Sequence, residues 1–170
     1  MTAGPLALEV RTADAALAGR QARWVAALEP WKSLGYQVPG LSRFLRRVAG
    51  AGGVLVAIVR SPSASPSRGR GRGRVVGVLA MQEGVLLGDF VSLLAVRADA
   101  AGRGVGRTLM AAVEAATPPR RWLYVSADAK NVAALAFYRK LGFRRVGRLP
   151  DMVREGRVEL LLRKPVTRPS

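Results

Sequence analysis

The sequence predicts an α/β (α+β) fold in which a mixed, mostly antiparallel sheet of six or seven strands carries helices on both faces. Three observations lead to this prediction. Strand-like and helix-like segments follow one another in the order β-α-α-β-β-β-α-β-α-β-β. Apolar residues make up 49% of the chain and charged residues 23%, which is typical of a globular protein. A length of 170 residues is enough for one domain with a sizeable core.

The first half of the chain contains two helical segments between strand-like runs. Thr12 is the predicted N-cap of the first helix, which ends before Pro30 because proline cannot continue the helical hydrogen bonds. The second helix follows Pro39, and a glycine-rich stretch stops it. Its apolar residues recur on one face: Leu41, Phe44, Leu45, Val48 and Ala49. The expected elements are a strand at 7–11, a helix at 12–28, the second helix, and a buried strand at 54–59.

The second half alternates strands with two amphipathic helices. We expect residues 1–165 to form a single domain and residues 166–170 to be a short tail. No internal repeat interrupts this pattern. The expected strands are 75–82, 87–96, 121–127, 143–149 and 158–164, and the expected helices are 104–116 and 131–142.

An insert rich in Ser, Pro, Arg and Gly separates two of the strands, at residues 61–74. Its composition cannot bury enough apolar surface to offset the entropy of ordering, so we expect a flexible hairpin connection. Two interpretations of its "SRGRGRGR" stretch remain open: a solvated linker, or contact with nucleic acid.

The composition excludes several classes of chemistry. The chain has neither cysteine nor histidine, which removes disulfides, thiol nucleophiles, Ser-His-Asp triads and nearly all zinc sites, and no metal is expected. The net charge of +17 attracts polyanions, but the charge is spread along the chain and fits an arginine-rich surface. No secretory signal and no long apolar run is visible, so a cytoplasmic protein without membrane contact is expected.

The stretch "AGRGVGRTL" (101–109) joins a strand to a helix. Glycines let a ligand approach the backbone, and the first N–H groups of a helix have no partners within it. Arg103 and Arg107 add positive charge beside these amides. The arrangement suits a pyrophosphate, and the alternative is an ordinary strand-to-helix turn.

Together, "LLAVRADAAGRGVGRTLM" (93–110) and "NVAALAFYRKLGF" (131–143) resemble the GNAT superfamily of acetyl-CoA-dependent N-acetyltransferases. The resemblance extends over most of the chain and implies a GNAT fold with acetyl-CoA as co-substrate and no metal. Ala101 stands where the family pattern has Gln or Arg, which removes one polar contact. The resemblance implies that the following residues bind the cofactor: Leu94, Ala95, Val96, Arg103, Gly104, Val105, Gly106, Arg107, Thr108, Asn131 and Tyr138.

The same resemblance implies direct transfer of the acetyl group to an amine. Tyr138 would protonate the departing thiolate, and the alternative for this residue is core packing. Some relatives carry a glutamate base on the fifth strand, where this chain has Ser126. Glu83, Asp89 and water remain as candidates for the base, of which we prefer Glu83.

The acceptor site is expected around the first two helices. In "EPWKSLGYQVPG" (29–40), Trp31 and Tyr36 are candidate pocket walls, and the alternative is a turn that packs both rings on the core. The expected acceptor is a primary amine of a small molecule or a protein N-terminus, and the positive charge disfavours a polycation. The alternatives are an acetyl-CoA-binding protein without transfer activity, and a basic nucleic-acid-binding module. We expect a monomer or homodimer with no nucleic acid bound.

Overall fold

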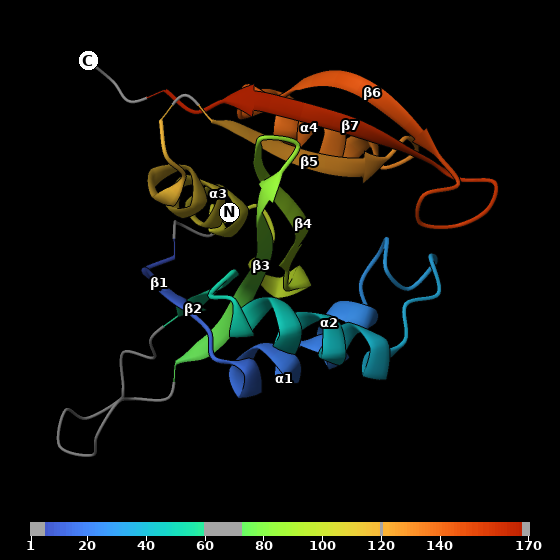
Figure 1. Cartoon of the computed structure of the whole chain (residues 1–170). Helices are drawn as coiled ribbons and strands as arrows, with labels where there is room; N and C mark the ends of the chain where they lie inside the picture. The colour runs from blue at the N-terminus through green and yellow to red at the C-terminus, as the bar shows by residue number, and fades with distance from the viewer. Residues whose placement is uncertain (1–5, 60–72, 120, 168–170) are drawn as a thin grey trace, which may run out of the picture.

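The computed structural model of the chain describes residues 6–59, 73–119 and 121–167 (Figure 1). Seven strands form one sheet in the order β1-β2-β3-β4-β5-β7-β6, which confirms the predicted fold class. The elements are β1 (Leu8–Thr12), α1 (Ala15–Ala26), α2 (Val38–Gly50), β2 (Val54–Val59), β3 (Arg74–Val85), β4 (Gly88–Val96), the 3₁₀ turn η1 (Ala98–Ala100), α3 (Val105–Ala116), β5 (Trp122–Asp128), α4 (Val132–Lys140), β6 (Arg144–Pro150) and β7 (Val158–Pro165).

One pair of strands differs from the others in this sheet. β4 and β5 are parallel, whereas all the other neighbouring strands are antiparallel. The chain reaches β5 from β4 through α3, since parallel neighbours need a crossover connection. In Figure 1, β5, β7 and β6 cross the direction of β3 and β4, so the sheet consists of two halves that meet at the parallel pair.

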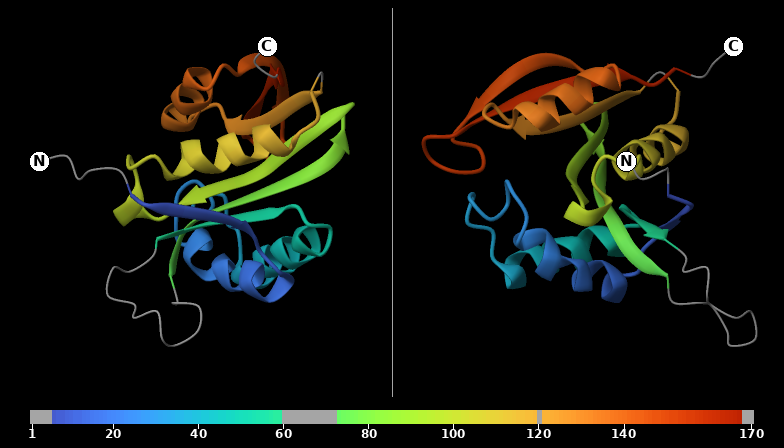
Figure 2. Two further views of the ribbon diagram at one scale, coloured as in Figure 1. Left: turned by 90° about the vertical axis from the view of Figure 1, so that its left-hand side faces the viewer. Right: turned by 180° about the vertical axis from the view of Figure 1, so that it is seen from behind.

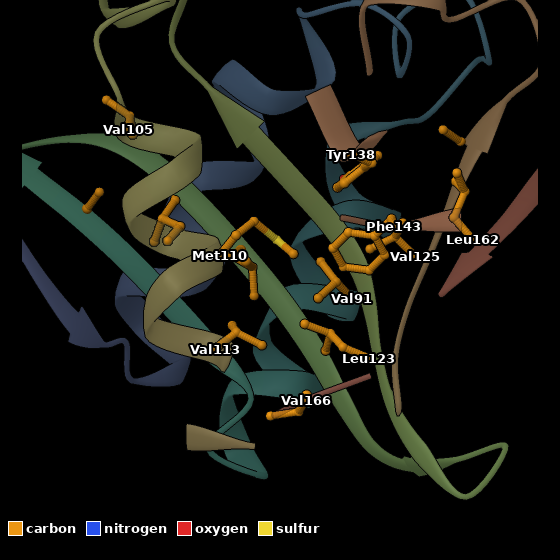
Figure 3. Packing of buried hydrophobic residues seen from close by; sticks show 14 of the residues in the cluster. Val91, Val105, Met110, Val113, Leu123, Val125, Tyr138, Phe143, Leu162 and Val166 are labelled. Atoms are coloured by element: carbon orange, nitrogen blue, oxygen red, sulfur yellow. The ribbon is translucent and has the colours of Figure 1, made fainter. Parts of the chain in front are cut away.

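Helices cover both faces of the sheet, as predicted (Figure 2). α1 and α2 pack on one face, against a cluster from β2, β3 and β4 that includes Val56 and Val78. α3 packs on the opposite face, and its cluster continues through β5 to α4. Figure 3 shows Met110 and Val113 of α3 directed toward Val91 and Leu123 of the central strands.

The start of α1 differs from the prediction. Asp14, not Thr12, is the N-cap: its Oδ1 accepts the N–H of Leu17 at 2.7 Å. Thr12 is still paired with Leu55 in the sheet, so it cannot begin the helix. The buried face of α1 consists mainly of small residues, which allow α2 to approach closely: Ala18, Gly19, Gln21, Ala22 and Val25.

Two predicted irregular segments have ordered residues at their borders. Most of the predicted insert at 61–74 lies outside the described residues, but its last residue, Arg74, begins β3 and pairs with Val59. Val166, at the start of the predicted tail, is buried, and its N–H donates to the carbonyl of Arg121 at 2.9 Å. Among the described residues, no helix combines the length and apolar character needed to cross a membrane.

Candidate active site

The site lies where the two central strands separate. β4 and β5 pair only from Gly88 and Trp122 to Val91 and Val125. Beyond this point the facing edges of the strands no longer pair, and a cavity of about 410 Å³ opens. The two strands contribute eight of its lining residues: Phe90, Val91, Ser92, Leu93 and Leu94 from β4, and Ser126, Ala127 and Asp128 from β5.

The glycine-rich loop leads into the N-terminus of α3. Gly102 and Gly104 have φ angles of 72° and 84°, in the left-handed region that glycine adopts without steric cost. Gly104 is the N-cap, and none of the described side chains caps this helix. The first bond of α3 runs from the N–H of Thr108 to the carbonyl of Gly104 at 2.9 Å. The amides of the first turn therefore remain available to an anion, which the helix dipole also attracts.

The glycines of this loop have different structural causes. A Cβ atom on Gly106 would lie 3.3 Å from Cζ of Phe137, so this glycine allows α3 to pack closely against α4. A Cβ atom on Gly104 would meet no atom of the described part of the chain within 4 Å. Arg107 is exposed beside this open space, and Arg103 is half-buried. The backbone amides, the space and the positive charge needed for an anion thus occur together at the start of α3.

The predicted cofactor residues of β4 and α3 differ in where their side chains lie. Leu94 lines the cavity, whereas Ala95 is buried in the cluster under α1 and α2. Val96 packs in the cluster under α3, where Val105 is a fully buried core residue. The family resemblance assigns backbone groups of Leu94 and Val96 to the cofactor, and this role of β4 stays a prediction.

Asn131 and Tyr138, at the start and near the end of α4, both line the cavity. Asn131 is the N-cap of the helix, and its Oδ1 accepts the N–H of Ala134 at 3.1 Å. The Tyr138 ring makes edge-to-face contacts with Phe137 and Phe143, with centroids 5.2 and 5.6 Å apart; Figure 3 shows Tyr138 beside Phe143. Burial raises the pKa of Tyr138, so its hydroxyl keeps its proton at neutral pH.

The two carboxylates considered as bases in the sequence lie away from this cavity. Glu83 is exposed on β3, opposite Asp89 in the β3–β4 hairpin. Asp89 is buried; its Oδ1 accepts the N–H of Gly84 at 3.3 Å and lies 3.7 Å from Nη1 of Arg121. Neither carboxylate is among the lining residues. The physical reason is that the hairpin adjoins the end of β4 that is still paired with β5.

The wall opposite α4 comes from two loops. Trp31 and Tyr36, in the connection between α1 and α2, both line the cavity. Nη1 of Arg154, in the β6–β7 loop, donates to the carbonyl of Ser33 at 2.6 Å. Figure 1 and the right-hand view of Figure 2 show these two loops side by side. The β6–β7 loop also contributes Met152 and Val153 to the cavity.

A comparison with family models identifies this architecture. The model of the acetyltransferase (GNAT) domain matches residues 52–145, more than half of the chain. The chain belongs to the GNAT acetyltransferase family. The matched segment includes the glycine-rich loop, together with both central strands and α4, which contribute lining residues to the cavity. A comparison with curated proteins finds no match.

Solved GNAT structures share this fold over nearly the whole chain. Ard1 from Thermoplasma volcanium is 19% identical with a TM-score of 0.72, covering 96% of this chain and 100% of that chain. Arabidopsis thaliana NAA60 in complex with acetyl-CoA is 18% identical with a TM-score of 0.69, covering 94% and 98%. Ribosomal-protein-alanine N-acetyltransferase from Brucella melitensis is 22% identical with a TM-score of 0.65, covering 92% and 99%. At these low sequence identities, the similarity shows only that the chain shares the fold of these three proteins.

The sequence analysis missed two carboxylates in the cavity of this GNAT acetyltransferase, Asp128 and Glu159. The register of β5 and β7 places these two residues opposite each other. This pairing joins segments far apart in the sequence, so no local pattern predicts it. One signal was available: Glu159 is the only charged residue in the run "VELLL" (158–162), and burying a carboxylate among apolar neighbours is costly.

Proposed function

We propose that this GNAT acetyltransferase transfers the acetyl group of acetyl-CoA directly to a primary amine of a small molecule or of a protein N-terminus. The observation that carries the proposal is the position of the cavity. It opens where β4 and β5 separate, with Tyr138 among its lining residues on one side and the aromatic side chains of Trp31 and Tyr36 on the other.

The residues near α3 fit the diphosphate of the cofactor. The uncapped amides of the first turn, the open space at Gly104 and the charges of Arg103 and Arg107 are what an anionic group needs. The edge of β4 at Leu94–Val96 would hold the pantetheine arm, with Asn131 on the other side of the cavity. When bound, the cofactor supplies an acetyl group activated as a thioester.

Tyr138 is proposed as the general acid. Its hydroxyl is protonated at neutral pH, and the residue lines the cavity from α4. Holding the two reactants in the correct geometry contributes up to about 7–11 kcal/mol, and positioned proton transfer contributes about 10²- to 10⁴-fold in rate. The reaction needs neither histidine nor cysteine, in agreement with the composition.

The acceptor end of the cavity favours an amine attached to an apolar group. Its walls are mainly aromatic and aliphatic, and two carboxylates lie among them, which suits a positively charged ammonium beside an apolar body. Two structural neighbours with the same fold are ribosomal-protein-alanine N-acetyltransferase and Ard1. The resemblance to ribosomal-protein-alanine N-acetyltransferase supports including protein N-termini among the candidate acceptors.

The test is a thiol-release assay with acetyl-CoA and a panel of amines: phenethylamine, tyramine, spermidine, and tetrapeptides with free N-termini. The chain has no cysteine, so a thiol-reactive dye reports only the released CoA. We expect turnover with an apolar amine or peptide and little with spermidine. Binding of acetyl-CoA in calorimetry without any turnover would favour the non-catalytic alternative. Absence of binding would contradict the proposal, and salt-sensitive binding to RNA instead would favour the nucleic-acid alternative.

A further inference from the structure

Glu159 is a buried carboxylate in the cavity that the sequence analysis gave no role. Only 5% of its surface is exposed, and it lines the cavity together with Tyr138. β7 carries it opposite Asp128 of β5, on the face of the sheet that also holds Ser126. The odd-numbered residues of β5, such as Val125, instead belong to the cluster under α3 and α4. Glu159 therefore lies on the side of the sheet away from α4, toward the proposed acceptor wall.

The neighbouring carboxylate, Asp128, is held by other groups. Its Oδ1 accepts the N–H of Lys130 at 2.7 Å, and its Oδ2 accepts a hydrogen bond from Nε of Arg157 at 2.7 Å and lies 2.7 Å from Nη2 of the same guanidinium. These contacts engage both oxygens of Asp128. Among the described residues, none forms an ion pair with Glu159. Of the two cavity carboxylates, Glu159 is thus the one that no ion pair holds.

The groups around Glu159 adjust its acidity. Burial raises its pKa, a hydrogen bond with Ser126 lowers it, the charge of Asp128 raises it and Arg157 lowers it, with a net increase. Tyr36, in the α1–α2 connection, is a neighbour of Glu159. Burial raises the pKa of the Tyr36 phenol, and the charge of Glu159 raises it further. A carboxylate with a raised pKa is a stronger base than one in water.

We propose that Glu159 is the general base of this enzyme, accepting the proton of the incoming amine inside the cavity. The inference rests on the proposed function and names a residue for the role that Glu83, Asp89 and water were candidates to fill. Ionised Glu159 would also attract the ammonium form of the acceptor into a cavity whose other walls are mostly apolar.

The proposed step is balanced in atoms and charge. Glu159 takes one proton from the ammonium, and the freed electron pair on nitrogen forms the C–N bond to the acetyl carbonyl. The C–S bond then breaks, and its electron pair leaves with sulfur, which takes a proton from the Tyr138 hydroxyl. The nitrogen loses its second proton to the Tyr138 phenolate. Glu159 finally releases its proton to water, leaving an amide, the thiol of CoA and one proton in solution.

The main experiment compares wild type with Glu159→Gln, using the panel amine with the highest turnover. We expect kcat to fall about 10²- to 10⁴-fold while the KM for acetyl-CoA stays unchanged. In wild type, kcat/KM should rise with pH through the raised pKa of Glu159, because the base acts when deprotonated; Glu159→Gln should lack this acidic limb. Glu159→Asp should keep the acidic limb of the pH profile, with a lower kcat/KM than wild type. The matched control is Glu155→Gln, which makes the same change at an exposed position of the β6–β7 loop that does not line the cavity, and should behave as wild type.

Stability separates the catalytic role from a structural one. A carboxyl group whose pKa is raised by folding binds its proton more tightly in the folded state, so its contribution to stability is present at low pH and declines as pH rises through that pKa. Glu159→Gln should therefore not lower the melting temperature at pH 8. A structural role predicts a lower melting temperature together with unchanged kcat in the surviving folded protein, and that result would overturn the inference.

Two further outcomes would contradict the assignment. If Glu83→Gln lost activity while Glu159→Gln kept it, the base would lie at the hairpin. If no amine is turned over, the proposed function fails. The inference about Glu159 is then tested separately, by following the titration of its carboxyl group by ¹³C NMR of glutamate-labelled protein. The Glu159 signal, assigned by its loss in Glu159→Gln, should titrate above the usual glutamate range and shift when phenethylamine is added. An ordinary titration with no response to phenethylamine would refute the inference.

Discussion

The two ends of the candidate active site, the start of α3 and the acceptor wall of the cavity, are built in different ways. The end near α3 depends on one continuous segment, residues 101–108, whose backbone amides and glycine conformations make the anion site. The end near the acceptor wall depends on side chains from three separate segments: the α1–α2 connection, the β6–β7 loop and β7. A backbone site tolerates changes in nearby side chains but not in the conformation of the loop. A side-chain site should behave in the opposite way, and substitutions at the two ends should therefore affect different parameters.

The largest effect is expected for Gly104→Val. A β-branched residue at a φ of 84° is strained, and its side chain would occupy the open space before the amides of α3. Affinity for acetyl-CoA should fall at least about 100-fold, equal to about 2.7 kcal/mol, as measured by calorimetry.

Gly52→Val provides a matched control for backbone strain. Gly52 has a φ of 78° and equally open surroundings, but it follows α2, far from α3 in the chain. Both variants should lose comparable stability, of about 1–3 kcal/mol, while only Gly104→Val loses cofactor affinity. Equal losses of affinity would mean that strain alone, and not the anion site, explains the result.

The next effect concerns Tyr138, which lies on α4 between the two ends. Tyr138→Phe keeps the ring contacts with Phe137 and Phe143 and removes only the hydroxyl. We expect kcat to fall about 100-fold with the dissociation constant of acetyl-CoA nearly unchanged. Tyr124→Phe is the control, because the Tyr124 hydroxyl donates to the carbonyl of Leu86 at 3.2 Å and the residue does not line the cavity. Equal kcat values for both variants and wild type would remove Tyr138 from the acid role.

The same difference in construction explains what the sequence predicted. The loop before α3 is a local motif, so its glycines, its two arginines and the following amphipathic helix were readable from spacing alone. The sheet and helices followed because strand and helix periodicities are local as well. Trp31 and Tyr36 were recognisable because large aromatic residues are unusual in a short connection.

Long-range geometry was not readable. Glu159 reaches the cavity through the register of β5 and β7, and Arg154 reaches Ser33 across 121 residues of sequence. Glu83 was preferred as the base from the sequence, but the hairpin that carries it adjoins the paired end of β4 and β5, so Glu83 does not line the cavity. Residues that act through folding of distant segments thus require the structure.

The smallest effect is expected for Arg154→Ala, which tests whether the two loops act as one wall. Removing the bond from Arg154 to the carbonyl of Ser33 frees the α1–α2 connection from the β6–β7 loop. The bond is exposed, so its contribution is modest, and we expect the acceptor KM to rise about threefold to tenfold. The affinity for acetyl-CoA should stay unchanged, because the site at α3 has no part in this contact. Arg148→Ala removes the same charge from an exposed position on β6 and serves as control. If both variants raise the acceptor KM equally, the effect comes from the lost charge; if only Arg154→Ala does so, the paired loops shape the acceptor end of the cavity.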